Sequence, residues 1–153
     1  MKLFKLAVAA IVLTCATLPA QAQNTLQEIL SGGVLKVGTP GDWNPMTMKD
    51  PATNSYTGYD IDVMTELAKD LDVKVEFVPT DWKTLVNGVI SGKYHMTGSA
   101  SITAGRAKVA GYSESYFAVV DVPLTLKKNS GRFSDWDDLN KSDVKIAATL
   151  GTA

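Results

Sequence analysis

The chain has 153 residues, of which 45% are hydrophobic and 20% are charged, and its formal net charge at pH 7 is -1. This balance is typical of an ordinary globular protein and excludes a largely disordered chain. The chain is not basic enough to argue for nucleic acid, and its charges are interspersed without blocks of one sign, so no nucleic-acid partner is expected.

The first 22 residues have the pattern of a secretory signal peptide. Lys2 and Lys5 precede an apolar run at residues 6–18, and Ala20-Gln21-Ala22 supplies small residues for cleavage. This run is shorter than the roughly 20 apolar residues that a membrane-spanning helix needs. We therefore expect residues 1–22 to be removed and the remainder to be a soluble secreted protein.

The mature chain opens with a predicted helix at 25–30, followed by a β-branched run at 34–38 that is typical of a buried strand. Residues 39–58 are rich in Pro, Gly, Asn, Asp and Thr, which predicts a long loop. Asp60 is then expected to cap a helix that ends near Asp70, because apolar residues recur there at helical spacing.

The rest of the chain continues the alternation of strands and helices. In order, the sequence predicts a strand at 73–78, a helix at 82–91, a strand at 94–98, a short helix at 106–110, a long strand at 118–127, a helical turn at 136–139 and a strand at 144–149. This order predicts an α/β fold in which a parallel sheet is flanked by helices.

Open parallel sheets bind ligands beyond the carboxyl ends of their strands. Two polar loops follow such ends here, at residues 39–45 and 98–106. We therefore expect a ligand site where these two loops meet.

The loop at 98–106 has the composition of an anion site. Gly98 allows a close backbone approach, Ser99 and Ser101 are hydroxyl donors, and Arg106 carries a planar fork of donors that matches a carboxylate. The alternative is an ordinary polar turn in which Arg106 forms a surface ion pair with Glu114. Spacing alone does not separate these two interpretations.

The loop at 39–45 contributes an aromatic residue, Trp43, which could stack on a ligand or cover its ammonium group. The alternative is a tryptophan half-buried against its own loop. The neighbouring Asp42 could pair with an ammonium group, and an Asx turn explains it nearly as well.

Motifs for metal or cofactor binding are missing from the sequence. The only cysteine, Cys15, lies in the leader, so the mature chain has no thiol for a disulfide or a zinc site. Asp60 and Asp62 would point in different directions on a helix, and the single histidine, His95, is interpreted as a structural residue of a strand. No P-loop, nucleophile elbow or dinucleotide fingerprint is present. We expect no metal and no cofactor.

Four stretches together resemble the periplasmic solute-binding proteins of family 3, which mostly bind amino acids for ABC transporters. They are "VLKVGTPGDWNP", "TGYDIDVMTELAKDLDVKVEFVPTDWKTLVNGVISGKYHM", "SASITAGRAKVAGYSESYF" and "VPLTLKK". The resemblance implies a first lobe at 23–126, with the hinge and the start of a largely missing second lobe at 127–153. It also implies a monomer that delivers a small carboxylate ligand to permease subunits in the inner membrane.

The resemblance assigns ligand-binding roles residue by residue. Arg106 corresponds to the arginine that holds the ligand carboxylate, and Pro40 stands where many members have an acidic residue for the ammonium group. The other implied ligand-binding residues are Trp43, Gly98, Ser99, Ser101 and, at the start of the second lobe, Thr152.

The stretch "GTPGDWNP" is also similar to cyclohexadienyl dehydratases, which are enzymes on the same fold. In that resemblance the general acid comes from the second lobe, so no catalytic residue is assigned in this chain. Because family members continue through a whole further domain, the resemblance implies that the sequence is a fragment.

Overall fold

The computed structural model describes residues 25–152, and the signal peptide predicted at 1–22 lies outside the described residues. In chain order the elements are α2 (Thr25–Gly32), β1 (Val34–Thr39), β2 (Asp42–Trp43), β3 (Thr47–Lys49), β4 (Tyr56–Thr57), α3 (Tyr59–Asp70), β5 (Lys74–Pro79), α4 (Leu85–Ile90), β6 (Met96–Thr97), the 3-10 turns η1 (Arg106–Lys108) and η2 (Lys127–Arg132), and α5 (Trp136–Leu139).

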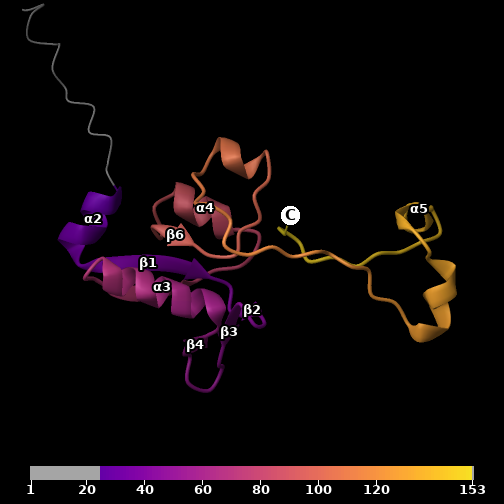
Figure 1. Ribbon diagram of the computed structural model, residues 1–153, viewed down its shortest axis with the longest axis horizontal. Coiled ribbons are helices and arrows are strands. Elements are labelled where there is room, and N and C mark those ends of the chain that lie inside the picture. The colour runs from indigo at the N-terminus through magenta and orange to yellow at the C-terminus, as the bar shows by residue number, and fades with distance from the viewer. Residues whose placement is uncertain (1–24, 153) are drawn as a thin grey trace, which may run out of the picture.

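Three parallel strands form the main sheet in the order β5-β1-β6. The central strand β1 pairs with β5 along its whole length, and its residues Val37 and Gly38 also pair with β6. The chain passes through α3 between β1 and β5, and through α4 between β5 and β6. Figure 1 shows these two helices on opposite sides of β1. The predicted α/β fold, a parallel sheet flanked by helices, is confirmed.

Each face of the sheet is covered by a different layer, because successive side chains of a strand point to opposite faces. Leu35 and Val37 are buried in the core that includes the apolar face of α3. On the other face the fully buried Tyr94 lies against Gly38, and its hydroxyl donates to the carbonyl of Leu85 at 2.6 Å. Tyr94 therefore ties α4 to the sheet.

The loop predicted at 39–58 contains a second, small antiparallel sheet with the order β2-β3-β4. The expected role of Asp60 as a helix cap is wrong, because Asp60 lies in the first turn of α3 and is buried. The N–H groups of Tyr59 and Asp60 donate instead to the carbonyls of Pro45 and Met46, each at 3.0 Å. Backbone from the predicted loop therefore takes over the capping of α3.

Three other elements are shorter than predicted at 82–91, 94–98 and 106–110. The helix α4 begins only at Leu85, because the carboxylate of Asp81 accepts from the N–H of Thr84 at 2.8 Å and holds the preceding residues in a turn. The strand β6 has two residues, and a single 3-10 turn, η1, stands where the short helix was expected.

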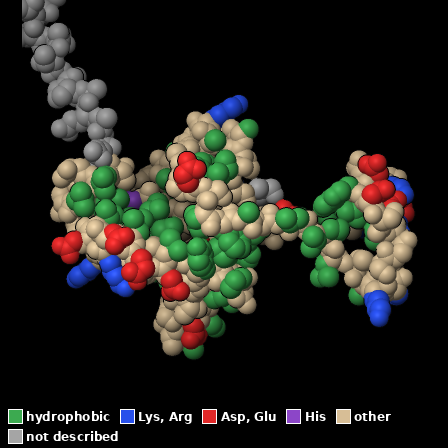
Figure 2. Space-filling model, in the orientation of Figure 1, with side chains coloured by type: hydrophobic (Ala, Val, Ile, Leu, Met, Phe, Trp, Pro, Cys, Tyr) green, Lys and Arg blue, Asp and Glu red, His purple; other side chains and the backbone are tan. Residues whose placement is uncertain are grey.

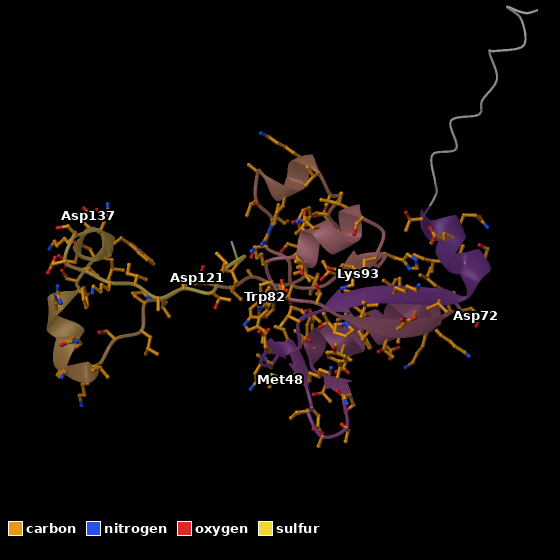
Figure 3. The ribbon with its side chains drawn as sticks, turned by 180° about the vertical axis from the view of Figure 1, so that it is seen from behind. Met48, Asp72, Trp82, Lys93, Asp121 and Asp137 are labelled. Atoms are coloured by element: carbon orange, nitrogen blue, oxygen red, sulfur yellow. The ribbon has the colours of Figure 1, made fainter. Side chains whose placement is uncertain are left out.

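The strands predicted at 118–127 and 144–149 are wrong, because the structure pairs neither segment with a neighbour. Residues 118–126 extend away from the lobe, with Asp121 on this extension in Figure 3. Figure 2 shows hydrophobic side chains along it, and Val120 and Leu124 are 86% and 99% exposed. An alternating sequence forms a strand only where a neighbouring strand and a core complete it.

The extension leads to an outlying unit built from η2 and α5 (Figure 1). The helical turn predicted at 136–139 is confirmed, and Asp135 caps it by accepting from the N–H of Asp138 at 3.0 Å. The chain then returns to the lobe, where the carbonyl of Gly151 accepts from the guanidinium of Arg106 at 2.8 Å.

The contact between Tyr94 and Gly38 gives a test of this packing. A Cβ atom at residue 38 would lie 2.4 Å from the Tyr94 ring, so we expect Gly38→Ala to lower the free energy of unfolding by about 1 to 3 kcal/mol. Gly32→Ala is the matched control, since nothing lies within 4 Å of a Cβ there. Urea unfolding followed by circular dichroism measures both, and equal midpoints would contradict the packing described.

Candidate ligand-binding site

The carboxyl ends of β1 and β6 bring the two expected loops together. Gly38 of β1 pairs with Thr97 of β6, and the Thr97 hydroxyl donates to the Gly38 carbonyl at 2.9 Å. The loop that follows β1 and the loop that begins at Gly98 therefore leave the sheet side by side. This is the arrangement expected for a ligand site in an open parallel sheet.

An open groove of about 110 Å³ lies beyond these strand ends. One wall is the loop 99–102, the other is the segment 112–117 with Val119, and Trp43 also lines the groove. Among residues 25–152, Glu114 is the only charged residue of the lining, and Tyr112, Tyr116 and Phe117 add aromatic rings to Trp43. The groove thus offers aromatic surface, hydroxyl groups and one carboxylate.

Trp43 is half-buried, as in the interpretation of a loop-packing tryptophan, and it also lines the groove, as in the interpretation of a ligand-stacking residue. Its ring meets that of Trp82 edge to face, with the centroids 5.7 Å apart. The Trp82 indole N–H donates to the carboxylate of Asp42 at 2.9 Å. Asp42 therefore has a hydrogen-bond partner within the protein, and the packing of Trp82 against Trp43 restricts the position of the Trp43 ring.

Ser99 and Gly98 pack against the buried carboxylate of Asp60. The Ser99 hydroxyl donates to one Asp60 oxygen, and the Ser99 N–H donates to the hydroxyl of Tyr116 at 2.9 Å. The backbone of Ser99 is left-handed, with φ at 55°. A Cβ atom at Gly98 would lie 2.8 Å from the carboxylate, so only glycine leaves room for it. Both donors of Ser99 therefore have partners within the protein.

Arg106 lies beside the groove and is bound to Ser101. One guanidinium nitrogen donates to the Ser101 carbonyl at 3.1 Å, and another donates to the Gly151 carbonyl at 2.8 Å. Among residues 25–152, the ion pairs do not include Arg106, so the alternative of a surface pair with Glu114 is not found. Its positive charge is balanced only by backbone carbonyls.

Thr152 does not line the groove, and the residue of this segment that contacts Arg106 is its neighbour Gly151. The Thr152 hydroxyl donates to the carbonyl of Thr149 at 3.0 Å, which closes a turn beside Arg106. A Cβ atom at Gly151 would lie 2.5 Å from the Cα of Lys83, next to Trp82, which Figure 3 labels near the start of the extension. The returning chain is therefore in contact with the part of the molecule that holds Trp82, Lys83 and Arg106.

Two residues that hold this site together, Asp60 and Tyr116, were not singled out as site residues from the sequence. Asp60 is 5% exposed although its side chain is a carboxyl group. Its neighbour Ile61 is part of the apolar face of α3. An acidic residue beside that face was the feature of the sequence that could have indicated a buried carboxyl group. Tyr116 gives no such signal, because its hydroxyl meets Asp60 only after the chain folds, at 2.9 Å.

Burial of the hydroxyl raises the pKa of Tyr116 above its usual value near 10. The N–H of Ser99 acts in the opposite direction, and the negative charge of Asp60 adds to the rise. The neutral phenol is therefore the form that the folded protein favours.

His95 lies away from the groove and has a structural role, in line with its interpretation from the sequence. Its Nδ1 atom accepts from the backbone N–H of Lys36 at 3.0 Å. Within residues 25–152, no cluster of acidic, histidine or cysteine side chains could hold a metal ion, and no helix there could cross a membrane.

The family model of the bacterial extracellular solute-binding proteins, family 3, matches residues 35–152. The chain belongs to this family. Its sequence is 34% identical over 113 residues to the L-cystine-binding protein TcyA of Bacillus subtilis, covering 74% of this chain and 42% of that protein. It is 31% identical over 140 residues to the cyclohexadienyl dehydratase of Pseudomonas aeruginosa, covering 91% and 52%. The chain thus spans about half the length of these curated relatives.

Solved structures show the same fold. An ancestral amino-acid-binding protein, AncCDT-1, described as a precursor of cyclohexadienyl dehydratase, matches with a TM-score of 0.76 and 42% identity over 84% of this chain and 56% of its own. Domain 1 of the arginine-binding protein of T. maritima, in its arginine-bound form, matches with a TM-score of 0.54 and 32% identity over 59% of this chain and 71% of its own.

The hydroxyl of Tyr116 predicts a pH dependence of stability. Because its folded pKa is raised, the contribution of Tyr116 is fully present below the unfolded pKa near 10 and is lost as the pH rises through the folded pKa. We expect the stability difference between wild type and Tyr116→Phe to be constant at neutral pH and to shrink at higher pH. Denaturant unfolding across this range measures it, and a difference that grows above pH 10 would contradict the assignment.

Proposed function

We propose that this chain forms the first lobe of a periplasmic protein that binds a small carboxylate, an amino acid, for uptake by an ABC transporter. The carboxylate is held by Arg106, assisted by Ser101 and by the turn at Thr152. Trp43 covers the ligand, and Gly98 and Ser99 form the backbone of the same loop. The observation that carries this proposal is the Arg106 guanidinium, which lies beside the groove without an acidic partner among the described residues.

The hydrogen bonds of Arg106 leave it able to bind an anion. A guanidinium has five N–H donors, and two nitrogens of Arg106 donate to the carbonyls of Ser101 and Gly151. These contacts orient the fork, and its remaining donors have no partner in residues 25–152. A carboxylate on the remaining donors would neutralise a charge that carbonyl dipoles only partly balance.

The ammonium group of an amino acid finds a partner in Glu114. The position where many family members have an acidic residue is Pro40, which carries no charge. Glu114 is the charged residue of the groove lining, and the Trp43 ring supplies a second favourable surface for a cation. An exposed carboxylate attracts a cation only weakly, so the affinity rests mainly on Arg106.

The relatives support an amino-acid ligand. Those named for a ligand include L-cystine-binding, glutamine-binding and histidine-binding proteins. One structural match is the arginine-bound form of a single domain 1. A first lobe by itself can therefore present enough of a site to hold an amino acid, although a second lobe would bury more of its surface.

Uptake requires a second lobe that closes on the ligand, and the segment from Asp121 to Lys127 with the returning chain is our proposed hinge. Hinges absorb the change in backbone angles at a few residues that carry little packing. The high exposure of Val120 and Leu124 fits such a connection. The partners of the closed protein are permease subunits in the inner membrane.

Replacing Arg106 tests the anchor. We expect L-arginine, L-glutamine, L-histidine or L-cystine to raise the melting temperature of the wild-type chain and Arg106→Ala to abolish that rise. Truncating one partner of a charged pair costs on the order of 2 to 5 kcal/mol of binding free energy. Arg132→Ala is the control, because Arg132 pairs with Asp143 in the outlying unit. A rise that survives in Arg106→Ala would overturn the anchor.

A second candidate function is a dehydratase that acts on prephenate or arogenate. The similarity to the cyclohexadienyl dehydratase of Pseudomonas aeruginosa extends over 91% of this chain, and the match to AncCDT-1 has 42% identity. This chemistry needs a general acid near the leaving hydroxyl. The buried Asp60 already accepts two hydrogen bonds from protein hydroxyls, which leaves Glu114 as the carboxylate of the groove.

Incubation with prephenate separates the two functions. We expect no product absorbance in the ultraviolet above the buffer rate, because the resemblance to cyclohexadienyl dehydratases assigns the general acid to the second lobe, and Glu114 is exposed in an open groove. The matched sample is Glu114→Gln, which lacks the acid. Product formed by the wild type and lost in Glu114→Gln would favour the enzyme over the binding protein.

A further inference from the structure

The two walls of the groove are not joined by a sheet. The loop 99–102 and the segment 112–117 belong to no strand of the structure. The described hydrogen bonds between them are from the Ser99 N–H to the Tyr116 hydroxyl at 2.9 Å and from the Tyr112 hydroxyl to the Ser101 carbonyl at 3.3 Å. The spacing of the walls therefore depends on a few side-chain contacts.

Asp60 connects both walls from beneath. One carboxylate oxygen accepts from the Ser99 hydroxyl in the first wall, and the other accepts from the Tyr116 hydroxyl in the second at 2.9 Å. Asp60 is 5% exposed, and it takes part in none of the ion pairs found among residues 25–152. A buried carboxylate is costly unless hydrogen bonds satisfy it, so these two hydroxyls are held firmly.

The first turn of α3 fixes Asp60 itself. The Asp60 N–H donates to the carbonyl of Met46 at 3.0 Å. The preceding residue, Tyr59, stacks on Tyr116 with the ring centroids 6.2 Å apart and contacts Phe117 at 6.3 Å. One helical turn thus holds the second wall by ring packing and both walls by hydrogen bonds.

We propose that Asp60 is a positioning residue of the ligand groove, whose carboxylate sets the distance between the two walls by binding Ser99 and Tyr116 together. The consequence for ligand binding rests on the proposed function. Ser99 then fixes the conformation of its loop and does not bind the ligand directly, because its hydroxyl and its N–H both have partners within the protein. The direct contacts of this loop with a ligand come from Ser101 and Arg106.

Hydrogen exchange tests this role without a ligand. In Asp60→Asn and in Tyr116→Phe we expect the amides of residues 98–102 to exchange about tenfold faster, because losing one hydrogen bond of roughly 1.4 kcal/mol changes the opening equilibrium by that factor. Amides of β1 and β5 should be unchanged. Asp62→Asn is the matched control, an exposed carboxylate on the same turn of α3.

Binding of L-arginine, measured by calorimetry well below the melting temperature, is the second readout. We expect an affinity about tenfold lower in Asp60→Asn and in Tyr116→Phe, with a double variant no weaker than either, because both remove the same link. A purely structural role would lower the melting temperature and leave the affinity unchanged. Should Asp60→Asn fail to fold, Ser99→Ala removes the same contact from the loop side.

The outcomes separate this inference from the proposed function. Unchanged exchange at 98–102 in folded Asp60→Asn and Tyr116→Phe overturns the positioning role, and so does unchanged affinity in both variants. Faster exchange in the variants, together with a wild type that binds none of the amino acids tested, supports the positioning role and overturns the proposed function.

Discussion

The pairing of β1 with β5 on one side and β6 on the other is the interaction on which the rest of the structure depends. A strand between two neighbours satisfies its backbone donors and acceptors on both edges, so it can be buried. The parallel direction also places the carboxyl ends of β1 and β6 together, at Gly38 and Thr97. Both loops of the groove start from these ends, and the position of the site follows from the sheet.

The first turn of α3 is the second point where several parts of the molecule meet. Its N–H groups are bound by carbonyls of the small sheet's connections, its Tyr59 ring packs on the far wall of the groove, and its Asp60 carboxylate lies under both walls. Burying a charge is unfavourable unless its hydrogen bonds are complete. The polar groups gathered there therefore allow few other arrangements, which is how a short loop without regular structure is held in one conformation.

Two kinds of polar residue occur at the groove: some are hydrogen-bonded within the protein and hold the loop, and others remain available to a ligand. Ser99 and Asp42 have protein partners, whereas Glu114 lines the groove and Arg106 has only carbonyl partners in the described part of the chain. Arg106 does not line the groove itself, but it donates to the lining residue Ser101, so a positive and a negative group lie near the same groove, which suits the proposed amino-acid ligand. The matched region spans about half the length of the curated relatives.

The sequence by itself determined the α/β class, the parallel sheet and the two polar loops that follow its strands, because local periodicity and short connections encode them. It also singled out Trp43, which lines the groove, and Arg106, which donates to the lining residue Ser101. Tertiary structure alone decided the partners: Asp60 became a buried acceptor for Ser99 and Tyr116, which lie 39 and 56 residues away along the chain. It also left the apolar pattern around Leu124 unpaired, because an alternating sequence specifies which face is apolar and not what covers it.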